Sequence, residues 1–201
     1  YRELKKEEQN NEQLIRKIIT VSINFADSFS GHEQAALVKL GAVEELYQLR
    51  DFSLAINYGH EIISTFKDID PSISRSLWLT MAHSAFELEQ FAEAENSYAE
   101  TLKIAHNIDH DYESIVENYA ASIYQQGDQA RSVGDSIIAA KHFLRVSKLA
   151  PTSKIVSVAR YDAGTELIIA EQWQRASVVL SSFRVDYPKH EYAKEIAKKL
   201  A

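Results

Sequence analysis

Small residues spaced twelve positions apart recur four times along the chain, and this spacing constrains the fold more than any other feature. The four pairs are Val43/Ala55, Ala82/Ala94, Gly127/Ala139 and Gly164/Ala176. A helix break such as Arg50-Asp51 or Gly134-Asp135 lies between the members of each pair. Ala or Gly at the crossing of two antiparallel helices lets their axes approach closely, whereas large side chains hold them apart. Each pair therefore predicts a tightly crossed helical hairpin, and four pairs predict a stack.

Composition and periodicity favour the same fold class. The 201 residues include only six glycines and three prolines, which is typical of helical proteins. Apolar residues recur at three- and four-residue steps over residues 73–89 and 155–170, as on one face of a helix. Asp70-Pro71 has the pattern of an N-cap followed by proline at the first helical position. No alternating stretch is flanked by hairpin-turn residues, so we expect an all-α chain.

Around these pairs the sequence resembles the tetratricopeptide repeat (TPR) family, whose pattern runs W-x2-L-G-x2-Y, then A-x3-F, then P. The matching residues are Trp78, Met81, Ala82, Ala85, Ala94 and Tyr98 in the second unit, Gly127, Ala130, Ala139, Phe143 and Pro151 in the third, and Ala163, Gly164, Leu167, Ala176, Leu180 and Pro188 in the fourth. The first unit matches with Ala42, Val43, Leu46 and Ala55, and has Gly59 where an aromatic residue is expected. The resemblance implies a right-handed α-solenoid of about four TPR-like hairpins.

The expected organisation has three parts. Residues 34–188 hold the repeats, and their expected ranges are 34–69, 71–106, 112–150 and 152–188. Residues 1–33 are expected to form an N-terminal helix, either a cap or the second half of a truncated repeat, and residues 189–201 a C-terminal capping helix. Such caps cover the apolar surface at the ends of a stack. The second-helix alanines lie 39, 45 and 37 residues apart, so the stack is expected to be irregular near the widest spacing.

Composition excludes several kinds of function. The chain has 22 basic and 29 acidic residues and a formal charge of −7, which argues against a nucleic-acid binder because such proteins displace phosphate counterions with Lys and Arg. It has no cysteine, and therefore no disulfide, thiolate zinc site or cysteine nucleophile. No apolar run reaches the roughly 18–20 residues that span a bilayer. The acidic stretch 87–117 contains the single base Lys103, and is either a solvated face or a patch that steers a basic partner.

No arrangement of residues favours an enzyme. The pairs His32-Glu33, His60-Glu61 and His190-Glu191 lack the second histidine of a zinc-protease helix. His106, Asp109, His110 and Asp111 are better explained as a solvated loop than as a metal site. There is no phosphate-binding glycine loop and no nucleophile elbow. We expect no catalytic residue, cofactor or metal. We expect the large aromatic residues Trp78, Phe91, Tyr98, Phe143 and Trp173 to pack between helices.

The TPR resemblance also implies a binding surface, because the first helices of successive repeats line a concave groove. The positions carried over are Leu40, Glu44, Tyr47, Leu79, His83, Phe86, Glu87, Tyr124, Asp128, Arg131, Tyr161, Thr165 and Ile168. Their aromatic and acidic character suits an apolar or basic segment, although they could instead only fill the interior of the superhelix. Leu40, Glu44 and Ala121 stand where a chaperone-tail clamp needs Lys, Asn and Lys, so we do not expect a chaperone C-terminal tail as partner.

The resemblance implies a non-enzymatic protein–protein interaction scaffold that binds a peptide or partner segment in this groove. Residues 183–200 are similar to the closing repeat of bacterial cell-envelope members of the family. This implies part of a larger bacterial protein in the periplasm or cell envelope, with the cytoplasm as the alternative location. The alternative function is a regulatory module that senses a peptide or small ligand and changes the shape of its superhelix.

Overall fold

The computed structural model describes residues 2–199, and the side chains of residues 11–196. The described residues form helices joined by short connections and contain no strand, so the all-α prediction is confirmed. The helices are α1 (Arg2–Ser28), α2 (Ala35–Gln48), α3 (Phe52–Thr65), α4 (Pro71–Glu87), α5 (Phe91–Ile104), α6 (Tyr112–Ser132), α7 (Ser136–Leu149), α8 (Val156–Ile169), α9 (Trp173–Asp186) and α10 (Ala193–Lys199).

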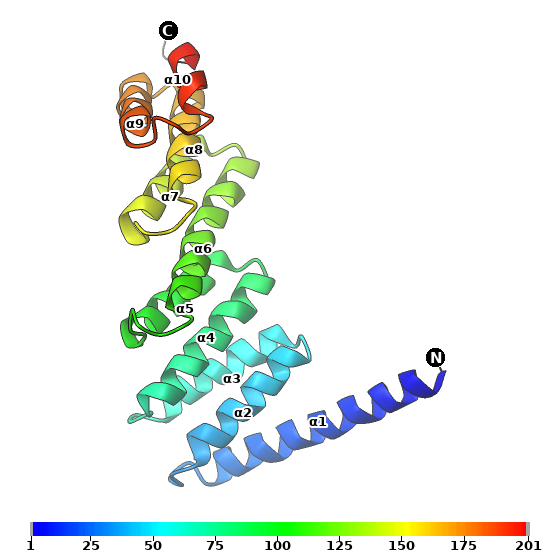
Figure 1. Ribbon diagram of the computed structural model, residues 1–201. Helices are drawn as coiled ribbons and strands as arrows, with labels where there is room; N and C mark the ends of the chain where they lie inside the picture. Colours follow the sequence, from blue (N-terminus) through cyan, green and yellow to red (C-terminus); the bar gives the residue numbers. More distant parts are fainter. Residues whose placement is uncertain (1, 200–201) are drawn as a thin grey trace. The chain divides into compact units, whose positions relative to one another are not determined.

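The helices form two compact units, residues 1–105 and residues 106–201, called the N-terminal and C-terminal units below. Within each unit every helix packs against its neighbours in chain order, as Figure 1 shows. The pairs α2–α3, α4–α5, α6–α7 and α8–α9 are helical hairpins, and they fall within the four ranges expected for repeats. Sequential packing of this kind is the arrangement of a solenoid-like repeat.

The same turn joins the two helices of every hairpin. One residue in each turn has a positive φ, namely Arg50 (62°), Glu89 (58°), Gly134 (80°) and Glu171 (57°). The N–H groups of this residue and the next donate to carbonyls of the preceding helix, as Arg50 does to Tyr47 and Asp51 to Leu46. This is the Schellman arrangement, which satisfies carbonyls that the helix end leaves free. Only Gly134 has the residue type that this conformation favours.

Close packing explains the small residues within the hairpins. A Cβ atom added to Gly127 of α6 would lie 2.6 Å from Cδ1 and 2.9 Å from Cζ of Phe143, which is fully buried on α7. A Cβ added to Gly164 of α8 would lie 2.5 Å from Cγ of Leu180 on α9. These distances are far below van der Waals contact. In these two hairpins the first helix therefore needs glycine where a large residue of the second helix packs on it.

A buried lysine joins the first three helices of the N-terminal unit. The Lys39 side chain of α2 is 3% exposed. Its Nζ atom lies 2.7 Å from an oxygen of Asp27 on α1 and 2.8 Å from an oxygen of Glu61 on α3. The two hydrogen bonds compensate the ammonium group for the water it loses on burial.

The aromatic residues expected to pack between helices do not all do so. Phe91, Tyr98 and Phe143 are buried as expected, and Trp78 is half-buried. Trp173 is 59% exposed, so the expectation is wrong for that residue. Trp173 is the first residue of α9, and its ring is not enclosed by its own unit.

The C-terminal unit ends on α10, whose Ile196 is fully buried. Tyr192, just before α10, stacks on Tyr161 of α8 with ring centroids 4.2 Å apart. These contacts cover the apolar residues of α8 and α9 at this end of the unit. The last two residues of the capping helix expected over 189–201 lie outside the described residues.

Candidate functional site

The thirteen candidate groove residues divide between the two units. Leu40, Glu44 and Tyr47 lie on α2 and Leu79, His83, Phe86 and Glu87 on α4, and these two helices pack against each other. Tyr124, Asp128 and Arg131 lie on α6, and Tyr161, Thr165 and Ile168 on α8. We call the first set the N-terminal face and the second the C-terminal face. All thirteen belong to the first helices of hairpins, and each face is described by itself.

The N-terminal face is built from rings. Tyr47 and His83 have ring centroids 6.0 Å apart, and His83 also meets the buried Tyr98 edge-on at 5.7 Å. Burial lowers the pKa of His83, and the nearby charge of Glu87 only partly opposes this. His83 is therefore a neutral ring near pH 7. Phe86 contacts Phe91 edge-on at 5.1 Å. The arrangement offers edges and faces of rings to an apolar side chain.

A shallow hollow of about 230 Å³ lies between α2 and α4 in the same unit. It is lined by Leu37, Leu40, Gly41, Glu44, Ser72, Ile73 and Ser76. Leu40 is itself buried, and so contributes mostly to packing. Desolvation, and then the charge of Glu45, raise the pKa of Glu44. The hollow thus combines apolar walls with one carboxylate that lacks a cationic neighbour strong enough to lower its pKa.

The C-terminal face centres on one guanidinium group shared by three carboxylates. Arg131 Nε lies 2.8 Å from Glu166 Oε1, its Nη1 3.0 Å from Asp128 Oδ1, and its Nη2 3.4 Å from Asp162 Oδ1. The guanidinium also lies over the ring of Phe143, 4.6 Å from its centroid. Three carboxylates against one cation leave two net negative charges. We call Asp128, Arg131, Asp162 and Glu166 the charged cluster.

The protonation states of the cluster follow from burial and neighbouring charge. Burial raises the pKa of Asp128, Arg131 lowers it, and the two other carboxylates raise it further. Burial opposes the charge of Arg131, but the carboxylates outweigh it and raise the arginine's pKa. Burial, and then a hydrogen bond to Asp162, raise the pKa of Tyr124. Its hydroxyl therefore keeps its proton and donates a hydrogen bond to Asp162 Oδ2, with the two oxygens 2.5 Å apart.

Two members of this cluster, Asp162 and Glu166, are absent from the positions carried over from the TPR pattern. Both lie on α8, where Glu166 is the only glutamate and is buried. A buried carboxylate in a largely apolar helix needs a cationic or hydrogen-bonding partner. The sequence showed a single glutamate in this segment, but not that it would be buried. Nor did it show the identity of the partner, 35 residues away on α6.

Two candidate positions do not face an approaching partner. Tyr161 packs against Phe183 and under Tyr192, and its hydroxyl hydrogen-bonds to Glu195 at 3.1 Å. Tyr161 and Leu40 are both buried, so they pack beneath the exposed residues of the two faces and are not accessible to a partner. Leu79, Thr165 and Ile168 are half-buried on their helices.

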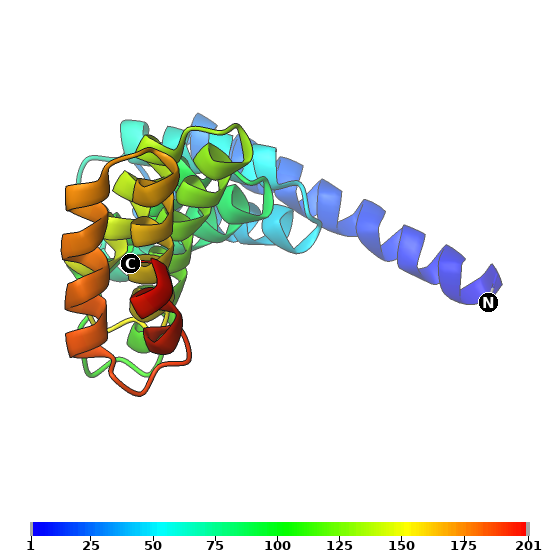
Figure 2. The ribbon, with the colours of Figure 1, turned by 90° about the horizontal axis from the view of Figure 1, so that it is seen from above.

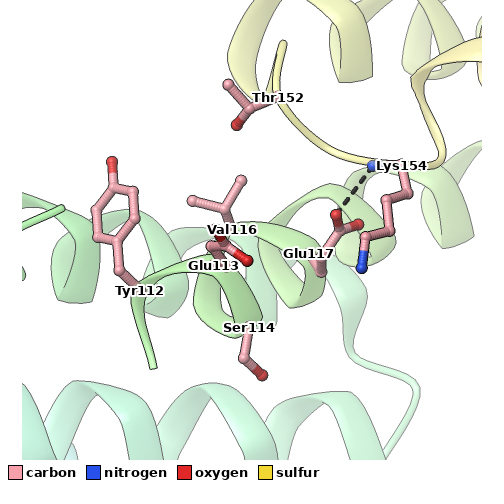
Figure 3. Close-up of a pocket in the computed structure, with 7 residues that line it drawn as sticks. All are labelled: Tyr112, Glu113, Ser114, Val116, Glu117, Thr152 and Lys154. Atoms are coloured by element: carbon pink, nitrogen blue, oxygen red, sulfur yellow. Dashed lines mark hydrogen bonds between the residues drawn. The ribbon is translucent and has the colours of Figure 1, made fainter. Parts of the chain in front are cut away.

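A larger hollow of about 530 Å³ lies beside the start of α6 in the C-terminal unit. Figure 3 shows the residues that line it, which are Tyr112, Glu113, Ser114, Val116, Glu117, Thr152 and Lys154. Glu117 accepts a 2.7 Å hydrogen bond from the Ser153 hydroxyl and a 2.9 Å bond from the backbone N–H of Lys154. These bonds hold the connection between α7 and α8 against α6, so Glu117 stabilises the packing of this connection.

Two absences hold for the part of the chain that the structure describes. It contains no group of three or more His, Cys, Asp or Glu side chains placed to hold a metal ion. None of its helices combines the length and apolar character that crossing a membrane requires.

Comparisons with known proteins identify no family. No protein-family model matches the chain, and no curated protein matches it. Among solved structures it is similar to the crystal structure of BtubC (BKLC) from P. vanneervenii, with 18% sequence identity and a TM-score of 0.43. The match covers 92% of this chain and 81% of that one.

Proposed function

We propose that this protein is a non-enzymatic interaction scaffold of the tetratricopeptide type, which binds a peptide or partner segment on the first-helix faces of its hairpins. The charged cluster of the C-terminal face is the observation that carries the proposal. Its three carboxylates exceed its one cation, and the side chain of Asp128 is 36% exposed. We assign no catalytic role to any residue.

The chemistry of the two faces defines the partner. A lysine or arginine of the partner would neutralise part of the excess negative charge around Arg131, and would do so in a partly desolvated place where charge pairs are stronger than in water. The rings of Tyr47, His83 and Phe86 suit an apolar side chain. The C-terminal face therefore suits a basic segment, whose binding weakens as salt is added, and the N-terminal face suits an apolar one.

A peptide-display selection on the immobilised full chain tests this proposal. We expect the retained peptides to be enriched in Lys or Arg. Asp128→Asn removes an exposed charge of the cluster, and we expect it to weaken the selected peptides about 10-fold, as loss of one charge-assisted contact does. Glu191→Gln is the matched control, because Glu191 is an exposed carboxylate outside both faces, and it should bind like the parent.

Two results would contradict the proposal. Selected peptides without a basic residue, or equal binding by Asp128→Asn and the parent, would remove the charged cluster from the binding site. A small ligand that raises the melting temperature when no peptide is retained would favour the alternative of a regulatory module. The bacterial cell-envelope origin expected from residues 183–200 stays a prediction, which fractionation of the source cells would test.

A further inference from the structure

Helix α1 has two apolar faces, and only one of them is buried. Ile19, Ile23 and Ala26 are buried in the N-terminal unit, where α1 packs along α2. A second stripe on α1 and just after it lies in solvent, with Leu14, Ile18, Val21 and Phe29 each between 52% and 67% exposed. Phe25, in the same stripe, is half-buried. We call these five residues the α1 stripe.

The end of α1 has the geometry of the second helix of a hairpin. Three backbone hydrogen bonds close its connection to α2, from Phe29 N to Phe25 O, from His32 N to Phe29 O and from Ala35 N to His32 O. The same three bonds, at the same spacing, close the connections from α7 to α8 and from α9 to α10. Because α7 and α9 are the second helices of their hairpins, α1 corresponds to the second helix of a hairpin as well.

Second helices bury the position that α1 exposes. Ile18 lies ten residues before the end of α1, and Ala139 and Ala176 lie ten residues before the ends of α7 and α9. The two alanines are 0% and 1% exposed, whereas Ile18 is 52% exposed. In α7 and α9 this side faces the first helix of the same hairpin. The α1 stripe is therefore a surface shaped to receive an antiparallel helix.

The segment directly before the stripe does not supply that helix. The hairpin turns before α7 and α9 occur at Asp135 and Gln172, and the equivalent position on α1 is Leu14. There α1 continues as a helix up to Arg2, and at 27 residues it is about twice as long as α2 or α3. Figures 1 and 2 show it running past these two helices within the N-terminal unit. A covering helix must therefore come from elsewhere.

The spacing of the stripe fits a second copy of itself. Leu14 and Phe29 lie equally far from the midpoint between Val21 and Ser22, and so do Ile18 and Phe25. In an antiparallel pair centred there, Leu14 of one copy meets Phe29 of the other, and Ile18 meets Phe25. The steps of four, three and four residues from Leu14 to Phe25 are those of a coiled-coil seam.

We propose that the protein forms a dimer in which the α1 stripes of two copies pair antiparallel. The five stripe residues are uncharged, so pairing them places no charged residue within the seam itself. Val21 of each copy meets the small Ser22 of the other, which lets the two helices approach closely at the centre of the pair. Pairing removes from water a contiguous set of large apolar side chains, which is the main driving force for association.

Sedimentation velocity of the full chain at increasing concentration tests the dimer. We expect a species of twice 22.8 kDa that dissociates on dilution. Ile18→Asp should raise the dissociation constant about 100-fold or more, because it places an unpaired charge in the seam. Val178→Asp is the matched control, since Val178 is 70% exposed on α9, and it should dimerise like the parent. A monomer throughout the concentration range, or a dimer that Ile18→Asp leaves intact, overturns the proposal.

Cysteine cross-linking tests the direction of pairing, and the absence of natural cysteines makes every bridge assignable. Leu14→Cys and Phe29→Cys, each alone, should remain uncross-linked, because a disulfide needs Cα atoms within about 7 Å. An equal mixture of the two variants should form a mixed disulfide dimer. Cross-linking of Leu14→Cys with itself would indicate a parallel pair and would refute the antiparallel arrangement.

Discussion

Because α6 and α7 cross so closely, adding a single methyl group at Gly127 of α6 should destabilise the protein. In Gly127→Ala, the new Cβ would approach three ring atoms of the fully buried Phe143, with Cδ1 at 2.6 Å and Cζ at 2.9 Å. A rigid, enclosed ring cannot turn away as a flexible chain end could. Overpacking costs up to about 3 kcal/mol, and the higher helix propensity of alanine returns about 1 kcal/mol. We expect a net loss of about 2 kcal/mol in the free energy of unfolding of the C-terminal unit.

Gly41→Ala is the control for this prediction. Gly41 lies within α2, and a Cβ atom added there would have no atom of the protein within 4 Å. Here only the propensity gain applies, so the same change should stabilise the N-terminal unit by up to about 1 kcal/mol. The two substitutions are chemically identical and should have opposite signs.

Hydrogen exchange measured by mass spectrometry in increasing urea is the assay, because it reports each unit separately without assuming two-state unfolding of the whole chain. Peptides from α6 and α7 should lose protection in Gly127→Ala at lower urea than in the parent. Adding Phe143→Leu should recover part of the loss if the ring is its cause. A Gly127→Ala protein as stable as the parent would refute the close approach of these two helices.

Three further predictions concern charge and backbone conformation. The double change Asp27→Asn with Glu61→Gln should destabilise the N-terminal unit by about 2 kcal/mol in urea unfolding, because it leaves the buried Lys39 ammonium without a carboxylate. Equal stability would show that water reaches this group. Glu171→Gly should stabilise the C-terminal unit by about 1 kcal/mol, since residue 171 has φ 57°, and a lower urea midpoint would contradict this. The lowered pKa of His83 means that the unfolded chain binds the proton more readily, so acidification below about pH 6.5 should destabilise the N-terminal unit. His83→Phe should reduce this pH dependence, and an unchanged profile from pH 8 to 5 would show that His83 is not its source.

The candidate site was only partly accessible to sequence reasoning. The repeat pattern selected Tyr124, Asp128 and Arg131, and these do gather on one side of α6. It missed Asp162 and Glu166 because their partner Arg131 lies on another helix, 35 residues before Glu166, and such a contact leaves no local periodicity. The same limit explains the wrong expectation for Trp173. The sequence indicated that Trp173 begins a helix, but not that its side chain would be exposed.

The helices and their turns are properties of the sequence itself. A helix depends on hydrogen bonds between residues four apart in the chain, so it can be recognised locally. The helices could therefore be expected from the apolar periodicity, from the few glycines and prolines, and from the breaks at Arg50 and Glu171. The small residues twelve apart also predicted the hairpins, although Gly127 and Gly164 turn out to lie against the large residues Phe143 and Leu180 and not against small ones.

Burial and charge pairing were decided only by the tertiary structure. Nothing local distinguishes the apolar stripe of α1 that packs on α2 from the one that lies in solvent, because both have helical spacing. Lys39 is buried between Asp27 and Glu61, yet in the sequence it resembles any surface lysine. The free energy of a buried group depends on which distant residues surround it, and only the packed fold brings those residues together.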